Sequence, residues 1–230
     1  HNVPVFGGRE MAFNYILDPD HTEDKLHNKK AADAQGEITR SEFSDDLGSI
    51  WSIDTTAAYE GVVQSIRTVI HLFPGIVLVL DEAKLEKKES ISIRWHTADK
   101  TAPAQDGSFT VANSPAFLSA KIFSLDDNEL SFGQGHHKYE APWDRNQFGP
   151  KMLEQPNNFI EAKLDNADHC RVLSLFSITK DGMETPKWNR KDNTISIETD
   201  SGKTIVSIHS DSITIGTEST AELWTAPFTV

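Results

Sequence analysis

Hydrophobic and polar residues alternate along most of this chain, which is the pattern of β-strands that bury one face. The alternation is clearest over residues 62–73, which are rich in β-branched side chains and end at the turn residues Pro74-Gly75. Residues 76–80 are then apolar without interruption, which indicates a strand buried on both faces. Together these segments predict a long hairpin at the centre of a sheet, with both strands largely buried.

Further short segments alternate in the same way and are separated by turn residues such as Asp106-Gly107 and Asp192-Asn193. They are residues 90–96, 108–111, 117–123, 159–164, 170–178, 194–197, 204–208 and 212–215. Many short strands at near-regular spacing predict an all-β fold, an antiparallel β-sandwich. Without an internal repeat or a linker, residues 1–230 are expected to form a single domain.

Helix is expected to be scarce. Residues 24–34 are charged and have little apolar stripe, so they are interpreted as a solvated loop with at most one helical turn. A second long irregular segment spans residues 133–157 and contains His136, His137 and Trp143. Loops of this length inside a compact domain are usually functional or disordered, so this segment is a candidate for a functional loop.

Composition narrows the possible functions. The net charge of −13 argues against nucleic-acid binding, which needs a basic face. The single cysteine, Cys170, excludes an internal disulfide framework. No apolar run approaches the length of about 20 residues that a membrane-spanning helix needs. The expectation is a protein that binds neither nucleic acid nor membrane.

The chain opens with His1-Asn2 and has no initial methionine. Either an exposed α-amino group lies beside the imidazole of His1, or the chain was cut from a longer polypeptide. The rest of the sequence carries no complete catalytic constellation, which favours the second interpretation. In a fragment, the absence of a signal peptide says nothing about the cellular compartment.

Several motifs occur in a characteristic order. They are His1-Asn2 before an apolar strand and Gly7-Gly8, residues 52–59, Arg67 within a long strand, residues 76–82, and a strand ending in Trp95-His96. In this order and spacing the chain resembles the C-terminal β-sandwich of the heparinase II/III-like polysaccharide lyases. The resemblance covers roughly residues 1–100; beyond them the chain shows a succession of strands that any sandwich would have.

This resemblance implies a larger enzyme. Such lyases cleave acidic, uronate-containing polysaccharides by β-elimination, and an N-terminal α/α-toroid carries their catalytic tyrosine and its partner. The catalytic residues are therefore expected upstream of residue 1, so this chain alone is expected to be inactive. The resemblance also implies a periplasmic or secreted protein acting on a sulfated glycosaminoglycan or alginate. In several members the histidine that corresponds to His1 is the last ligand of a structural zinc completed by upstream residues.

Three residues are candidates for lining the substrate. His96 ends an alternating strand, although a half-buried structural histidine is the alternative. Arg67 lies in an apolar neighbourhood and needs a partner there, which Asp81 or Glu82 on the returning strand could supply. Trp143 is the tryptophan expected to reach solvent and offer a face to a sugar ring.

Other chemically capable residues have simpler interpretations. Tyr59 could serve acid–base chemistry, but packing against the sheet is expected. Cys170 lies in a core strand and is expected to be inert. Adjacent histidines in an extended segment point to opposite faces, so His136 and His137 are expected to be solvated. Asp18, Asp20 and His21 are expected to form a turn around Pro19 rather than a metal site.

Two other functions stay open. The chain could be a non-catalytic sandwich that binds carbohydrate or packs against another domain. Alternatively, the amine and ring of His1 could chelate copper together with a second histidine, as in the polysaccharide monooxygenases. The single cysteine excludes the disulfides that those monooxygenases usually contain.

Overall fold

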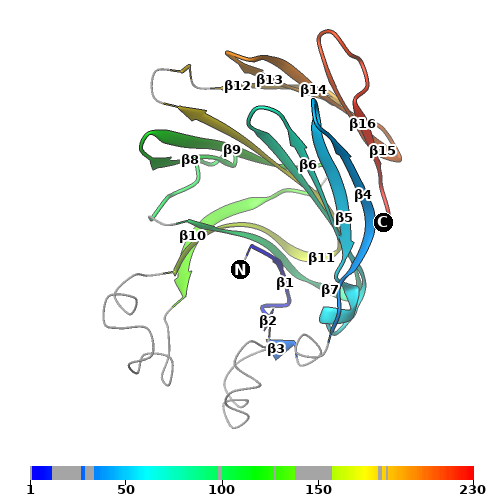
Figure 1. Cartoon of the computed structure of the whole chain (residues 1–230). Coiled ribbons are helices and arrows are strands. Elements are labelled where there is room, and N and C mark those ends of the chain that lie inside the picture. The colour runs from blue at the N-terminus through cyan, green and yellow to red at the C-terminus, as the bar shows by residue number, and fades with distance from the viewer. Residues whose placement is uncertain are drawn as a thin grey trace.

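The computed structural model describes residues 2–11, 27–28, 34–97, 100–126, 128–137, 157–180, 183–184 and 186–230. These residues form almost only β-strands, so the all-β prediction is confirmed (Figure 1). The described helix is one 3-10 turn, η2 (Thr56–Ala58). Within the described part of the chain, no helix is long and apolar enough to cross a membrane.

The larger of two stacked sheets has nine strands, ordered β4-β5-β6-β7-β11-β9-β8, with β1 paired to β7 and β10 paired to β11. Their bounds are β1 Pro4–Phe6, β4 Glu37–Ser44, β5 Gly48–Asp54, β6 Val62–Leu72, β7 Ile76–Thr97, β8 Ser108–Asn113, β9 Ala116–Ser124, β10 Ser131–His137 and β11 Asn157–Lys180. All of these pairings are antiparallel.

The second sheet has five antiparallel strands in sequence order. They are β12 Lys187–Lys191, β13 Thr194–Thr199, β14 Gly202–Ile208, β15 Ser212–Thr217 and β16 Trp224–Pro227. A separate pair of two-residue strands, β2 (Glu10–Met11) and β3 (His27–Asn28), runs parallel. The predicted antiparallel sandwich is therefore present, with one sheet much larger than the other.

The two longest strands, β7 and β11, bend together and fold the large sheet over itself (Figure 1). In the register Trp95 is opposite Ile160 and Phe176 is opposite Val77, yet the rings of Trp95 and Phe176 are 4.7 Å apart. Register shifts between Leu164 and His169 mark the bend, because a β-bulge kinks a strand without ending its pairing.

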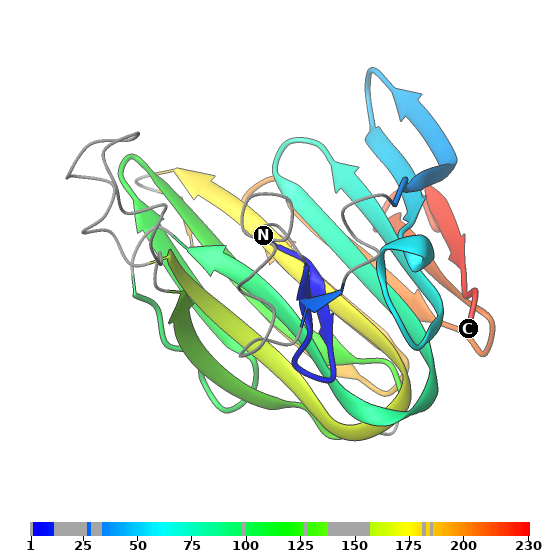
Figure 2. The same ribbon diagram turned by 90° about the horizontal axis from the view of Figure 1, so that it is seen from below.

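This bend produces three layers and two cores. The middle layer is the part of the large sheet that faces the five-stranded sheet. The two pack together through buried side chains such as Ile195 and Ile215 against Leu78 and Leu175. The middle layer packs on the lower layer, made by β1, β10 and the adjoining parts of β7 and β11, through a second cluster that includes Ile93 and Ile160. Seen from below, β1 lies near the middle of the lower layer (Figure 2).

The predicted hairpin of residues 62–80 is confirmed, with Leu78, Val79 and Leu80 buried and Val77 half-buried. Two other expectations need correction. The segments 76–80 and 90–96 are one strand, as are 159–164 and 170–178, because both strands stay paired through the bend. The segment 133–157 is not irregular at its start, since residues 133–137 belong to β10 and pair with β11.

Candidate functional site around Asn2

Arg67 and Asp81 form a buried ion pair across β6 and β7. The guanidinium Nε and Nη2 donate to the two carboxylate oxygens over 2.7 and 2.9 Å. The side chain of Asp81 is only 2% exposed. Burial lowers the pKa of Arg67, but the charge and hydrogen bonds of Asp81 outweigh burial, so the pKa is raised. Of the two partners predicted for Arg67, the structure selects Asp81.

Glu82 has a different partner because successive side chains on a strand point to opposite faces. Its Oε1 accepts a hydrogen bond of 2.7 Å from the backbone N–H of Thr229. Glu82 is 2% exposed, and burial raises the pKa of its carboxyl group against the lowering effect of the hydrogen bonds to Thr229. Glu82 is therefore part of the packing of the C-terminal segment.

Arg67 also holds the N-terminal segment. Its Nη1 donates to the backbone carbonyl of Asn2, and its guanidinium lies 5.1 Å from the ring centroid of Trp95. The indole Nε1 of Trp95 in turn donates to Ser174 Oγ over 3.1 Å. All three hydrogen bonds described for Arg67 are made inside the protein, so Arg67 supports the framework of the site. Its role as a substrate-lining residue stays a prediction.

Asn2 joins Arg67 to His96. The side-chain Oδ1 of Asn2 accepts a hydrogen bond of 2.6 Å from the backbone N–H of His96 and lies 3.3 Å from His96 Nδ1. The ladder between β1 and β7, which pairs Pro4 with Ile93, brings the two residues together. The structure therefore gathers two of the predicted substrate-lining residues, Arg67 and His96, around Asn2.

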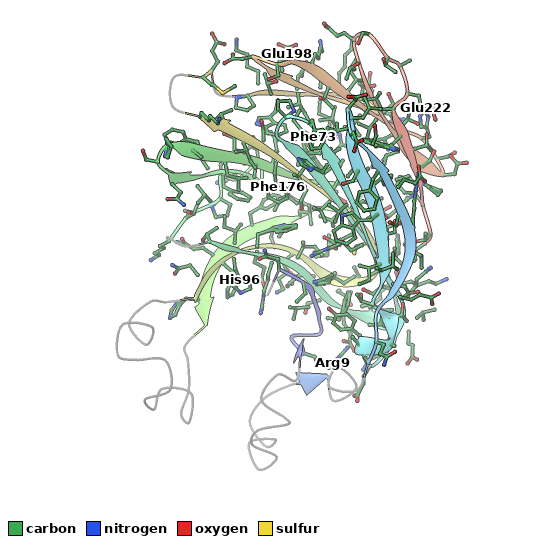
Figure 3. All side chains as sticks on the ribbon, viewed as in Figure 1. Arg9, Phe73, His96, Phe176, Glu198 and Glu222 are labelled. Carbon is green, nitrogen blue, oxygen red and sulfur yellow. The ribbon has the colours of Figure 1, made fainter. Side chains whose placement is uncertain are left out.

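The ring of His96 lies on the outer side of the lower layer, away from the core residue Phe176 (Figure 3). It is 5.7 Å from the ring of Phe159, and the guanidinium of Arg94 is 4.6 Å from the same ring. Arg94 also donates to Glu161 over 2.8 Å. A Cβ at Gly135 would come within 2.3 Å of the Phe159 ring, so a glycine is required where Phe159 covers β10.

Sequence reasoning missed Arg94, Phe159 and Glu161 as neighbours of His96. Alternation alone puts Arg94 and His96 on one face of β7. The pairing of Phe159 with His96 and of Glu161 with Arg94 depends on the register of β7 with β11, two strands far apart in sequence. No local pattern in either segment specifies that register.

The other candidate residues agree with their structural interpretations. Tyr59 is 3% exposed, packs edge-on against Phe6 at 4.8 Å, and donates to the carbonyl of Pro4 over 3.0 Å. Burial raises the pKa of Tyr59, which makes it a poor acid–base catalyst. Cys170 lies in the core as predicted, and burial raises the pKa of its thiol, which disfavours the reactive thiolate.

Some predicted site residues lie outside the described part of the chain: His1, Trp143, Asp18, Asp20 and His21. The side chain of His137 is also outside it, whereas His136 is exposed. Among the residues that are described, no group of three or more His, Cys, Asp and Glu side chains could hold a metal ion. These residues do not form a zinc site by themselves, and the role of His1 as a zinc ligand stays a prediction.

No protein-family model matches the chain, and no curated protein matches it by sequence. Among solved structures, it superposes on heparinase III with a TM-score of 0.57 and 11% identity, over 90% of this chain and 29% of that one. The heparan sulfate lyase HepC from Pedobacter heparinus gives a TM-score of 0.58 and 13% identity, over 90% of this chain and 30% of the lyase. The chain thus spans less than a third of either enzyme, and at these identities it shares with them the fold of a β-sandwich domain.

Proposed function

We propose that this chain is the β-sandwich portion of a polysaccharide lyase that cleaves acidic, uronate-containing polysaccharides by β-elimination. The observation that carries the proposal is the fold match, which includes about 90% of this chain but only about 30% of heparinase III and HepC. In the proposed enzyme an N-terminal α/α-toroid supplies the catalytic base and acid. In this proposal the protein is periplasmic or secreted, because it encounters its polysaccharide substrate there.

The residues around Asn2 support a positioning role for the sandwich. Arg67, anchored by Asp81, holds the carbonyl of Asn2, and Asn2 holds His96 at the end of β7. His96 and Arg94 then share the outer face of the lower layer through their contacts with Phe159. We place this face toward the polysaccharide and toward the toroid, with His96 as the residue that lines the substrate.

The assay is the ultraviolet absorbance of the unsaturated uronate product, with heparan sulfate and alginate as substrates. A longer polypeptide that contains this chain is expected to turn over one of them, and the 230-residue chain alone is expected to be inactive. His96→Ala in the longer polypeptide is expected to lower kcat/KM, whereas His209→Ala, an exposed histidine at the β14–β15 turn, leaves it unchanged.

Clear turnover by the isolated chain would contradict the placement of the catalytic residues. If the longer polypeptide binds a polysaccharide without cleaving it, the lyase proposal is wrong and a non-catalytic carbohydrate-binding sandwich is correct. Copper-dependent oxidation that requires His1 would instead identify a polysaccharide monooxygenase.

Zinc is a separate part of the proposal. His1 is one imidazole, and a structural zinc site needs about four ligands, so in this proposal upstream residues provide the others. Elemental analysis of the longer polypeptide is expected to find stoichiometric zinc that His1→Ala removes. Tight zinc in the 230-residue chain would contradict this arrangement.

A further inference from the structure

The contacts between Asn2 and His96 determine which nitrogen of the His96 ring carries the proton. A backbone N–H is always a donor, so the Asn2 atom that lies 2.6 Å from His96 N is the amide oxygen. The same oxygen lies 3.3 Å from Nδ1 of the His96 ring. Because a carbonyl oxygen only accepts, a hydrogen bond between them requires that Nδ1 carries the hydrogen.

We infer that Asn2 is a positioning residue that holds neutral His96 in its Nδ1–H tautomer, with Nε2 as the hydrogen-bond acceptor. A hydrogen bond at one ring nitrogen commonly sets the role of the other in this way. This is the opposite of the tautomer that a free histidine side chain prefers in water, in which Nε2 carries the hydrogen. The protein must therefore hold the amide oxygen of Asn2 in place.

Contacts that do not involve His96 provide that support. Arg67 donates to the backbone carbonyl of Asn2, and its guanidinium is itself fixed by two hydrogen bonds to Asp81. Two residues further along, the carbonyl of Pro4 accepts a hydrogen bond of 3.0 Å from the buried Tyr59 hydroxyl. The segment that carries Asn2 is therefore anchored to Arg67 on β6 and to Tyr59 just before β6, in addition to its pairing with β7.

The tautomer limits what His96 can recognise. A neutral ring whose Nε2 bears a lone pair accepts a hydrogen bond from a hydroxyl group and repels a carboxylate. Nε2 of His96 is covered in the structure, so a ligand must first displace the atoms that cover it. If the proposed lyase function is correct, on which this step rests, the substrate group that then reaches Nε2 is a sugar hydroxyl and not the carboxylate of the uronate. Binding of the uronate carboxylate then depends on other residues.

The tautomer can be measured without substrate. In the full 230-residue chain labelled with ¹⁵N-histidine, long-range ¹H–¹⁵N spectra above the pKa of the ring separate protonated from unprotonated ring nitrogens. His96, assigned through the His96→Gln variant, is expected to show a protonated Nδ1 and an unprotonated Nε2. Asn2→Asp keeps the acceptor oxygen and is expected to keep this pattern. Asn2→Ala removes the oxygen and is expected to shift His96 toward the Nε2–H form.

His209 provides the internal control, because it is exposed at a turn of the five-stranded sheet and its ring signals are expected to stay constant in every variant. An Nε2–H pattern in the unaltered chain overturns the inference, as does an unchanged His96 pattern in Asn2→Ala. The measurement on the unaltered chain decides the question even if a variant folds poorly.

A second measurement tests the hydroxyl contact in the longer polypeptide. An oligosaccharide of the cleaved polymer, added to a variant that lacks turnover, is expected to move the Nε2 signal of His96 in the direction of hydrogen-bond acceptance. No movement at saturating oligosaccharide overturns the hydroxyl contact. Since the tautomer itself is read without saccharide, its failure is distinguishable from failure of the proposed lyase function.

Discussion

Arg67 and Asp81 lie directly opposite one another in the β6–β7 register and are joined by two hydrogen bonds, of 2.7 and 2.9 Å. Two parallel N–H···O bonds are the geometry in which arginine binds a carboxylate most specifically. Here the pair stabilises a sheet and at the same time presents the remaining guanidinium nitrogen, Nη1, to the N-terminal segment at Asn2.

Removal of one partner of this pair is expected to be strongly destabilising. Arg67→Met leaves the carboxylate of Asp81, 2% exposed, without its counter-charge, and such changes typically cost about 3–5 kcal/mol. Urea unfolding followed by circular dichroism measures the change in free energy. Lys187→Ala is the control, because Lys187 and Glu184 form an exposed pair and loss of such a pair changes stability by about 1 kcal/mol or less.

The double variant Arg67→Met/Asp81→Leu distinguishes a lost charge pair from lost packing. It removes both charges and is expected to recover much of the stability lost in Arg67→Met. A double variant no more stable than the single one would show that the guanidinium acts mainly through its contacts with Trp95 and Asn2.

Tyr59→Phe tests the structural role of Tyr59. The variant keeps the edge-on contact with Phe6 and loses the hydrogen bond to Pro4, so we expect a destabilisation of about 0.5–1.5 kcal/mol. Because burial raises the pKa of the phenol, lyase turnover by a longer polypeptide is expected to persist in this variant. Loss of turnover with unchanged stability would instead assign Tyr59 to the chemistry.

Glu82→Gln is expected to stabilise the protein at neutral pH. Burial raises the pKa of Glu82 in the folded state, so the folded protein binds this proton more tightly than the unfolded chain. The stability contributed by Glu82 is therefore greatest below its unfolded pKa and falls as pH rises through the folded pKa. Glutamine keeps an oxygen for the N–H of Thr229 and carries no charge to desolvate.

The stability difference between Glu82→Gln and the unaltered chain is expected to be largest at neutral pH and to vanish below the ordinary pKa of glutamate. Unfolding curves across this pH range measure it. A variant that is equally destabilised at every pH would show that the carboxylate is fully compensated by its hydrogen bonds.

Asp106→Asn is expected to show the opposite pH dependence. Hydrogen bonds from Lys121 and Ser108 lower the pKa of Asp106 to about 2. A lowered folded pKa contributes stability above the unfolded value, and this contribution is lost as pH falls through about 2. The asparagine variant is therefore expected to be slightly less stable at neutral pH and equally stable only below about pH 2. Asp106 is largely exposed, so solvent screening keeps the effect small.

Truncation to alanine is expected to separate buried from exposed positions within the large sheet. Leu175→Ala removes a fully buried side chain between the middle layer and the five-stranded sheet, and we expect a loss of about 2–5 kcal/mol. Val63→Ala on β6 changes a side chain that is 53% exposed and is expected to alter stability by no more than about 0.5 kcal/mol. Equal effects in chemical denaturation would contradict the assigned layers.

The sequence by itself determined the all-β class and the central hairpin, and it limited the partner of Arg67 to Asp81 or Glu82, between which the structure selected Asp81. Side-chain alternation follows from the two-residue period of a strand, so it can be read locally. The turn at Pro74-Gly75 sets the register of the hairpin, and Arg67 and Asp81 lie equally far from Pro74 on its two sides. The burial of Tyr59 and Cys170 could also be predicted locally, because each lies in or beside an apolar segment.

Only the tertiary structure decided what surrounds His96. His96 contacts Asn2, which lies just before β1, and Phe159 on β11. Both residues are far from His96 in sequence. The fold of the large sheet depends on register shifts near residues 164–169, and the sequence there still reads as two separate strands. Register between distant strands is set by the burial of whole faces, a cooperative property that no local pattern contains.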